Sequence, residues 1–411
     1  MNPFVLKLLF GICAGSVIYN YIGYPLLLFL LSILLQAKSD LLFLMRGPKN
    51  RRCAPQVNEL PSVAMLLSVY NEEDVIKAKI QNALLSDYPA EKLELLIGLD
   101  APTDFTAERA KEAQSERCRI FAFPVRRGKL AVIRDLAQRT SAPILVLTDA
   151  NTMFERGCIR RLMRHFADPD VGVVSGRHIW VTNAGTEPST EALYWRYESA
   201  VKFLESRLNC LLGAYGSVYA VRRSLFHSTR DSLIEDFQIP LEILFGGHRI
   251  VYDSEAIAIE DLAPTFATNF ERRVRVAAGG YQTLMNNPQC LNPLKGLPAF
   301  AYFSHRVLRW LAPFFLLTAF FCNTWLVREP LFVLLLALQA AVYSMAAVAY
   351  WGQKRGKSTA FSSIPLGFCS MNVALLLGFY RYICGSQSKT WRVAPRTIST
   401  NTPYTAIERD H

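Results

Sequence analysis

Four long apolar blocks constrain the fold of this chain more than any other feature of its sequence. The first runs from Phe4 to Leu35, and the other three cover about 307–327, 331–351 and 364–384. Each is long enough for an α-helix that crosses a bilayer, which needs roughly 20 apolar residues. The first block is too long for the core of a signal peptide, and its Tyr-Pro pair is no cleavage site. We therefore expect a membrane protein with one N-terminal and about three C-terminal transmembrane helices.

The residues between the apolar blocks are mixed and charged, as in a globular domain. Aromatic side chains such as Trp310, Trp325 and Trp351 stand near the block ends, where interfacial aromatics are common. These patterns predict an N-terminal anchor, a globular domain, amphipathic interface helices, C-terminal transmembrane helices and a basic tail. The expected bounds are 1–36, 37–265, 266–301, 302–385 and 386–411.

Positive charge follows the first apolar block. Five basic residues stand there against one acid: Lys38, Arg46, Lys49, Arg51 and Arg52 against Asp40. Because basic residues collect on the cytoplasmic side, the pattern predicts a multi-pass protein of the inner (plasma) membrane with its globular domain in the cytoplasm. Lipid headgroups and acidic substrates explain the net charge of +11, and no nucleic acid partner is needed. The nine cysteines lack paired spacing, which argues against a zinc site or a disulfide framework.

The C-terminal tail conflicts with four simple crossings. Four crossings place the C terminus outside, yet the tail contains Lys389, Arg392 and Arg396. Either the tail violates the charge rule, or one C-terminal block is not a simple crossing. The sequence leaves both possibilities open.

Short apolar runs alternate with helical patterns in the globular domain. The runs are Ser62–Ser68, Leu93–Leu99, Arg119–Phe123 and Ile144–Leu147, and the helices are expected at Glu72–Leu85, Thr103–Gln114, Lys129–Gln138 and Arg156–Phe166. This alternation predicts an α/β fold with a mostly parallel sheet and helices on both faces. The chain has no G-x-G-x-x-G, which argues against a dinucleotide-binding fold of the usual kind.

The last of these runs ends abruptly in Thr148-Asp149-Ala150-Asn151. Ligands in open α/β sheets bind beyond the carboxyl ends of the strands, so Asp149 is placed where a substrate would lie. A carboxylate there can hold a hard divalent cation, which in turn holds phosphate oxygens. The alternative is that Asp149 caps the next helix.

Two earlier strands also end in polar residues. Asn71-Glu72 follows the first strand, and Asp100 is the last residue of the second. Asn71 and Thr103 fit helix capping. Asp100 is instead placed to accept hydrogen bonds from a bound ring or ribose.

Two features of the second half indicate a ligand site with a general base. Gly213-Ala214-Tyr215-Gly216 precedes a short strand, and its glycines let the backbone approach a ligand, although a structural bulge is the alternative. Glu235-Asp236 opens a helical segment, and a carboxylate in a cleft can act as a general base. Glu260-Asp261 repeats this acidic pair, but spacing favours Asp236 over Asp261 as the base.

The segment 266–285 has the apolar spacing of an amphipathic helix on a membrane surface. Its polar side carries Arg272, Arg273 and Arg275. A basic side that faces solvent or lipid headgroups is the alternative to a functional cluster.

Taken in order, these motifs resemble the membrane-embedded family 2 glycosyltransferases, a group with the GT-A fold that includes cellulose, chitin, hyaluronan and poly-N-acetylglucosamine synthases. The resemblance rests on Ser68–Glu73, Asp100–Thr106, Gly128-Lys129 and Thr148–Asn151. It implies a donor site of Asn71, Glu72, Asp100, Lys129 and Asp149, with Asp100 at the nucleotide base and Asp149 at the start of the metal-binding D-x-D. Asn151 stands at the last position, so Asp149 and Asn151 would hold Mg²⁺ or Mn²⁺ with one carboxylate fewer.

The resemblance also implies roles for the second half of the chain. Asp236 matches the catalytic base of the T-E-D motif, and Arg275 matches the arginine of Q-x-x-R-W that stabilises the leaving diphosphate. Arg272 replaces the glutamine of that motif, and Val276 replaces its tryptophan, the stacking platform for the acceptor sugar. The implied acceptor site comprises Gly213, Tyr215, Gly216, Glu235, Arg272 and Arg273.

The expected function is that of an inverting membrane glycosyltransferase. It would transfer a sugar from a nucleotide-diphospho-sugar, with a UDP-sugar as the expected donor, to a growing extracellular or capsular polysaccharide, with export or regulatory subunits as possible partners. The first alternative is a single-sugar transferase that acts on a polyprenyl-linked acceptor. The second is a non-catalytic membrane protein that only binds nucleotide-sugars.

Overall fold

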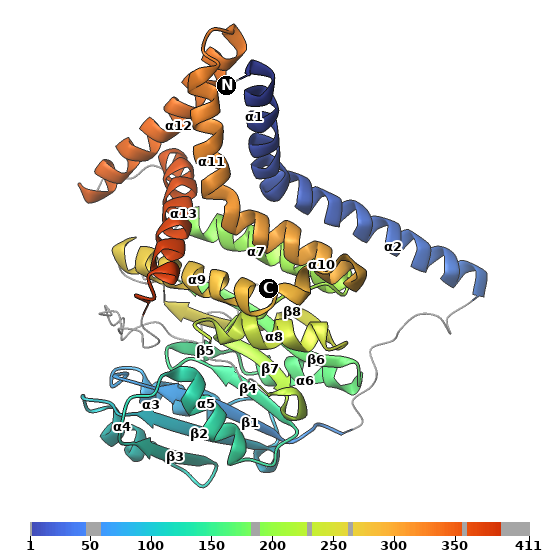
Figure 1. Ribbon diagram of the computed structural model, residues 1–411. Helices are drawn as coiled ribbons and strands as arrows, with labels where there is room; N and C mark the ends of the chain where they lie inside the picture. The colour runs from blue at the N-terminus through green and yellow to red at the C-terminus, as the bar shows by residue number, and fades with distance from the viewer. Residues whose placement is uncertain are drawn as a thin grey trace.

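The computed structural model describes residues 2–46, 59–181, 190–227, 232–261, 266–355 and 360–387. Figure 1 shows a sheet domain at one end of the molecule and long helices at the other. Between them lie three helices, α7, α9 and α10, with bounds Thr190–Arg207, Phe266–Asn286 and Leu297–Ala301. The predicted fold class, an α/β sheet domain with additional apolar helices, is confirmed.

The first half of the sheet is parallel. It contains β1 (Val63–Val69), β2 (Leu93–Asp100), β3 (Cys118–Phe123) and β4 (Ile144–Thr148), in the spatial order β3-β2-β1-β4. Each lies within a residue or two of a predicted run. Strands β1 and β4 are buried along their whole length, as expected of central strands covered on both faces.

The helices of this half explain where a ligand would bind. They are α3 (Ile76–Leu84), α4 (Thr106–Glu112) and α5 (Lys129–Gln138). The strand order reverses direction after β3, so right-handed crossovers place α5 on the face opposite α3 and α4. The reversal opens a crevice at the carboxyl ends of β1 and β4, where ligands of doubly wound folds bind.

The second half of the sheet is mixed. Next to β4 lies antiparallel β7 (Val218–Arg222), followed by β6 (Val171–Val181), β8 (Arg249–Asp261) and β5 (Thr152–Phe154). Strand β5 immediately follows the Asp149 loop and pairs with the far end of β8, with Thr152 opposite Glu260. The helices here are α6 (Cys158–Met163) and α8 (Glu235–Phe245). Short 3₁₀ turns occupy Ala90–Lys92, Arg164–Ala167, Arg223–Leu225, Pro288–Leu291 and Pro293–Lys295.

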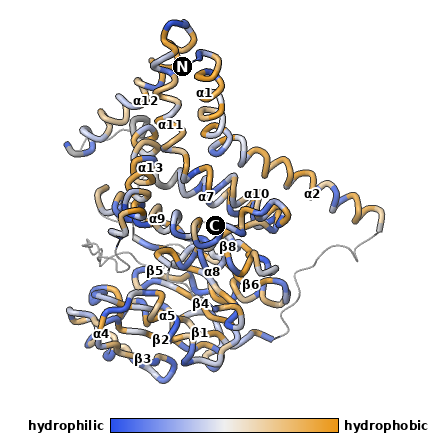
Figure 2. Tube along the Cα trace, viewed as in Figure 1, coloured by the Kyte–Doolittle hydropathy of each residue, from blue (hydrophilic) through white to orange (hydrophobic). Residues whose placement is uncertain are grey.

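The four apolar blocks are helical, and within the described ranges four stretches are long and apolar enough to cross a membrane: Pro3–Met45, Leu297–Trp325, Pro330–Gln353 and Ile364–Ile383. They contain α1 (Pro3–Ile18), α2 (Tyr24–Arg46), α11 (Leu308–Trp325), α12 (Pro330–Lys354) and α13 (Ala360–Ile383). Figure 2 shows hydrophobic residues along these helices, and many of them are exposed on the surface. Such surfaces indicate an apolar environment.

The first apolar stretch is longer than expected and is bent. A π-helical turn at Tyr19–Gly23 separates α1 from α2, and Figure 1 shows α1 beside α11 while α2 turns away. At its outer end α1 is fixed by an ion pair of 2.6 Å between Lys7 and Glu329, in the loop between α11 and α12. The start of α1 and this loop therefore lie at the same end of the molecule.

The end of α13 lies against the interface helix α9. Arg381 on α13 forms an ion pair of 2.9 Å with Glu271 on α9, and Gly378 packs against Ala277. The last apolar helix thus ends on the side of the sheet domain. The tail from 388 onward and the basic residues at 49–52 lie outside the described residues.

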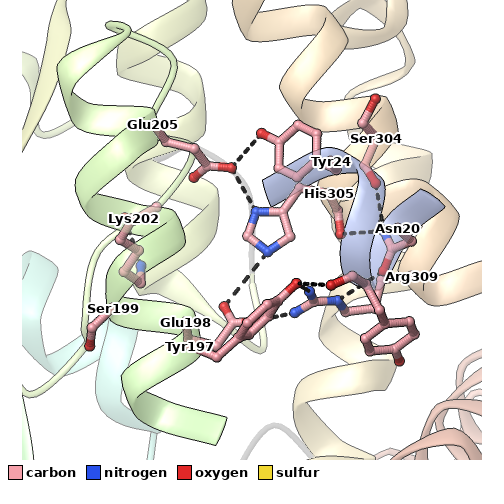
Figure 3. Close-up of polar contacts among 12 residues, drawn as sticks. Asn20, Tyr24, Tyr197, Glu198, Ser199, Lys202, Glu205, Ser304, His305 and Arg309 are labelled. Atoms are coloured by element: carbon pink, nitrogen blue, oxygen red, sulfur yellow. Dashed lines mark hydrogen bonds and ion pairs between the residues drawn. The ribbon is translucent and has the colours of Figure 1, made fainter. Parts of the chain in front are cut away.

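A buried polar cluster joins the bent helix to the rest of the protein (Figure 3). This junction cluster consists of Tyr24, Glu198, Glu205, His305 and Arg309. Glu205 accepts a hydrogen bond from the Tyr24 hydroxyl at 2.8 Å and lies 2.7 Å from His305 Nδ1, while Glu198 pairs with Arg309. A second π-helical turn, Tyr302–Val307, carries His305.

Candidate active site

The loops after β1 and β2 are tied to each other. The Asn71 side chain, on a residue with φ of 52°, accepts a hydrogen bond from the main-chain N–H of Thr103 at 2.8 Å and donates to its hydroxyl at 3.0 Å. The main-chain N–H of Glu72 donates to Thr106 Oγ1 at 2.7 Å. These contacts give Asn71 and Glu72 a loop-fixing role beside the predicted donor-binding role, which stays a prediction.

Asp100 anchors the start of helix α5. Its carboxylate is only 3% exposed and accepts hydrogen bonds from the main-chain N–H groups of Arg127 at 2.7 Å and Gly128 at 2.8 Å. Gly128 has φ of 89°, a left-handed conformation that favours glycine, and Lys129 is the next residue. Asp100 thus holds the turn that presents Lys129, and its contact with a nucleotide base stays a prediction.

Lys129 connects the Asp149 loop to the start of helix α8. Its ammonium group is 2.8 Å from Asp149 Oδ1, 2.7 Å from Glu235 Oε1 and 3.4 Å from the carbonyl oxygen of Gly216. Burial alone would raise the pKa of Asp149, but the contact with Lys129 outweighs it and holds that pKa below its ordinary value. The Asp149 side chain is still 36% exposed, so a ligand can reach it.

Asp236 sits in the first turn of α8, beside the glycine loop. Its Oδ2 accepts a hydrogen bond of 3.1 Å from the Gly216 N–H, and its carbonyl accepts one of 2.9 Å from Ala214. Burial and, next, the neighbouring carboxylate of Glu235 raise the pKa of Asp236, although Lys129 opposes the shift. A carboxyl with a raised pKa in a cleft suits a general base. The rival Asp261 ends β8, and its side chain lies outside the described part of the structure.

The other loop residues are placed by buried contacts. The Gly213 carbonyl accepts a hydrogen bond of 3.1 Å from Lys202 of α7. Glu205 of the junction cluster lies three residues later on the same helix. Tyr215 is 7% exposed, and its hydroxyl lies 3.1 Å from Ser199 Oγ. The buried Tyr215 side chain therefore anchors the glycine loop to α7.

The three arginines of α9 do not act as one group. Burial lowers the pKa of Arg275, and the charges of Glu235, Asp236 and Asp149 all act on it, which places Arg275 near the Lys129 centre. The Arg272 guanidinium lies 4.9 Å from the centre of the Trp180 ring. Arg273 instead donates to Ser370 Oγ of α13 at 3.2 Å. Arg273 thus contacts the apolar helix α13, and its acceptor-binding role stays a prediction.

Several residues at the site were not predicted. His178 and Trp180 alternate along β6 and stack with ring centres 4.4 Å apart, and Ser217 Oγ lies 2.7 Å from His178 Nδ1. Burial and the nearby Arg272 charge lower the pKa of His178 to about 3, so its ring is neutral. The period of two in β6 was the available signal that these side chains share a face.

A buried lysine donates hydrogen bonds to both ends of the Asp149 loop. Lys79 of α3 is fully buried, donates to Thr148 Oγ1 at 2.9 Å and also donates to the Thr152 carbonyl. Burial lowers the pKa of Lys79 to about 7. The pattern of an ordinary amphipathic helix gave no sign of this role, because a lysine in a helix is most often exposed.

The donor set at the Asp149 loop fits a hard cation in part. Asp149 offers an accessible carboxylate, and Asn151 offers an amide oxygen, because its Nδ2 already donates to Glu260 Oε1 at 2.8 Å. No group of three or more His, Cys, Asp or Glu side chains arranged for a metal ion occurs within the described residues. Mg²⁺ commonly takes one or two protein carboxylates, with substrate phosphates and water completing its shell.

The strand order and the helices around the sheet have the architecture of a GT-A-type fold. Residues 65–229 match the family described as Glycosyl transferase family 2. The overall fold of the chain resembles that of a mannosyltransferase from Pyrobaculum calidifontis, solved with GDP-Man and Mn²⁺. The TM-score is 0.68 at 19% identity, and the match covers 92% of this chain and 100% of that one.

Two curated relatives are similar in sequence. One is a poly-beta-1,6-N-acetyl-D-glucosamine synthase of Staphylococcus aureus, 25% identical over 58% of this chain. The other is an N-acetylglucosaminyltransferase of Rhizobium leguminosarum, 22% identical over 57% of this chain. In each case the match spans 59% of the relative's own length.

Proposed function

We propose that this protein is an inverting membrane glycosyltransferase that uses a nucleotide-diphospho-sugar. The observation that carries the proposal is the bridge made by Lys129, which contacts Asp149 on the donor side and Glu235 on the acceptor side. Asp236, the base candidate, follows Glu235 directly and is held by Gly216. The family of the domain and the synthase relatives support the same reaction class.

In the proposed reaction Asp236 takes the proton from an acceptor hydroxyl. The hydroxyl oxygen forms a bond to the anomeric carbon on the face opposite the diphosphate, and the bond from that carbon to the diphosphate oxygen breaks. The nucleoside diphosphate leaves with the bonding electrons, and configuration inverts because attack and departure occur on opposite faces. Lys129 and Arg275 are the cationic groups placed to stabilise negative charge as it builds on the diphosphate.

Asp149 and Asn151 are the residues that would hold Mg²⁺ or Mn²⁺. A bound cation would neutralise charge on the donor diphosphate. Lys129 contacts the same carboxylate, so it would move toward the phosphates as the donor binds.

Trp180 is our candidate for the acceptor platform that Val276 cannot provide. Its ring is part of an aromatic group with Trp195, 6.1 Å away, and Arg272 lies over it. Trp195 in turn lies 6.0 Å from Tyr215 of the acceptor loop. Indole rings offer the large rigid faces on which sugars stack. The acceptor we propose is therefore a saccharide, either a growing polysaccharide or a sugar on a lipid carrier.

The test uses membranes that contain the full chain, Mg²⁺ or Mn²⁺, and a panel of labelled nucleotide-sugars. Wild type is compared with Asp236→Asn and, as the matched control, Asp261→Asn. A large product lost only in Asp236→Asn supports a polysaccharide synthase, and a small product extractable by organic solvent supports a lipid-linked transferase. Donor binding without transfer from any sugar would support the binding-only alternative and contradict the proposal.

A further inference from the structure

The Asp149 loop lacks a second carboxylate, but a carboxylate from another strand lies beside it. Glu260 Oε1 accepts the hydrogen bond of 2.8 Å from Asn151 Nδ2, and its Oε2 accepts one of 3.3 Å from Thr152 Oγ1. Antiparallel pairing of β5 with β8 sets this contact, because Thr152 is directly opposite Glu260. Glu260 is 9% exposed, so the contact is largely shielded from water.

The contact fixes the orientation of the Asn151 amide. An ionised carboxylate can only accept hydrogen bonds, so the amide must turn its NH₂ toward Glu260. Its oxygen then points to the other side, away from Glu260. His178 lies on the other side of Glu260, with its Nε2 3.3 Å from Glu260 Oε2 while Ser217 contacts the other ring nitrogen. Donors from Asn151 and Thr152 thus contact both oxygens of the carboxylate, so Glu260 is placed as the outer-sphere partner of a metal ligand commonly is.

The same geometry explains why asparagine stands where an aspartate would be expected. An aspartate at 151 would place a carboxylate oxygen about 2.8 Å from Glu260 Oε1, where the present structure has a donor and an acceptor. Two carboxylates at such a distance cannot both stay ionised without a strong mutual penalty. Asn151 and Glu260 therefore form a matched pair in which the negative charge sits on β8.

We propose that Glu260 is a positioning residue that orients Asn151 so that its amide oxygen serves the donor-side cation, and that Glu260 supplies the charge missing from the D-x-D triplet. The inference rests on the proposed function, because it assumes that the Asp149 loop binds a cation with the donor. It predicts a non-additive relation between two positions that are 109 residues apart in sequence.

The test measures Mn²⁺ binding by electron paramagnetic resonance on the purified full chain in detergent, with UDP and with GDP as probes. The variants are Glu260→Gln, Asn151→Asp and the double variant, with Glu255→Gln as the control on the same strand, since that side chain is 62% exposed. Glu260→Gln should weaken Mn²⁺ binding by ~10–100-fold, as loss of an outer-sphere partner does. Asn151→Asp should also weaken it, by ~10-fold or more, although it restores the D-x-D triplet. The double variant should return to near wild-type affinity.

Two results would overturn the inference. The first is tighter Mn²⁺ binding in Asn151→Asp alone, and the second is unchanged binding in Glu260→Gln. Thermal unfolding of each variant separates misfolding from a local effect, and recovery in the double variant cannot arise from a misfolded protein. Asp149→Asn distinguishes failure of the cation site itself from failure of the positioning role of Glu260. If wild type binds no Mn²⁺ with either nucleotide, or Asp149→Asn binds it equally well, the cation of the proposed function fails together with the inference.

Discussion

Gly216→Ala is the sharpest perturbation of the proposed base. A Cβ on Gly216 would lie 2.8 Å from Asp236 Oδ2 and 3.1 Å from the Asp236 Cβ and Cγ atoms. The backbone of Gly216 is not in the left-handed region, so alanine is conformationally acceptable there, and the three atoms nearest the new Cβ all belong to Asp236. Non-bonded heavy atoms prefer separations of ~3.5–4.0 Å, so the carboxylate must move by ~0.5–1 Å.

The displacement removes the alignment of the 3.1 Å hydrogen bond between the Gly216 N–H and Asp236 Oδ2. A hydrogen bond to a charged group contributes ~1.5–3 kcal/mol. Each 1.36 kcal/mol of barrier corresponds to about tenfold in rate, so we expect kcat to fall by ~10–100-fold. Donor KM should change by less than about threefold, because Lys129 and Asp149 keep their contact.

The assay is initial-rate transfer of labelled sugar at saturating acceptor, with donor concentration varied. Gly157→Ala is the control, since the nearest atoms to its new Cβ are 3.6 Å away on the flexible Arg161 side chain. If Gly216→Ala kept kcat within about twofold of wild type while folding normally, the contact with Gly216 would not position the reacting carboxylate. A large rise in donor KM with unchanged kcat would equally contradict the reasoning.

Four further outcomes follow from the site and the junction cluster. Lys129→Gln should raise donor KM and lower kcat, each by ~10-fold or more, because Asp149 and Glu235 lose their shared cation; steady-state kinetics measures both. Trp180→Ala should raise acceptor KM by ~2–10-fold with donor KM unchanged, measured by varying acceptor. The pH profile of kcat should lose activity as pH falls through a pKa above the ordinary value for aspartate, because the base must be deprotonated and its pKa is raised. Glu198→Gln should destabilise the fold by ~3–5 kcal/mol, seen as a lower Tm, since it leaves the buried Arg309 guanidinium without its ion-pair partner.

The parallel half of the sheet was predictable because its signals are local. The apolar runs at β1, β2 and β4 and the helices between them repeat the strand–helix alternation along the chain, and β1 pairs with β2 and β2 with β3, the next strand along the chain in each case. The first helical turn of α8 was equally local, since Glu235 and Asp236 open a continuous apolar segment. Patterns of this kind need no knowledge of distant residues.

Long-range pairing explains what the sequence could not provide. Glu260 reaches Asn151 only because β8 pairs with the short strand β5. No local pattern in the sequence predicts this pairing of strands about 100 residues apart. The bend of the first apolar stretch likewise depends on the junction cluster, in which His305 and Tyr24 both contact Glu205. A continuous apolar run predicts one helix, and Gly23 and Pro25 were the only local signs of the π-helical turn at Tyr19–Gly23.

The position of Lys129 shows why the two halves of the sheet must assemble before any site exists. The lysine comes from α5 of the parallel half, and one of its partners, Glu235, comes from α8 of the mixed half. Neither half alone places a base, an acceptor loop and a donor carboxylate within contact of one another. The base candidate has its raised pKa for the same reason, because burial and Glu235 act on Asp236 only inside the assembled cleft. Catalytic competence is therefore coupled to the packing of the second half on the first, and variants that loosen this packing should lose transfer before they lose the parallel sheet.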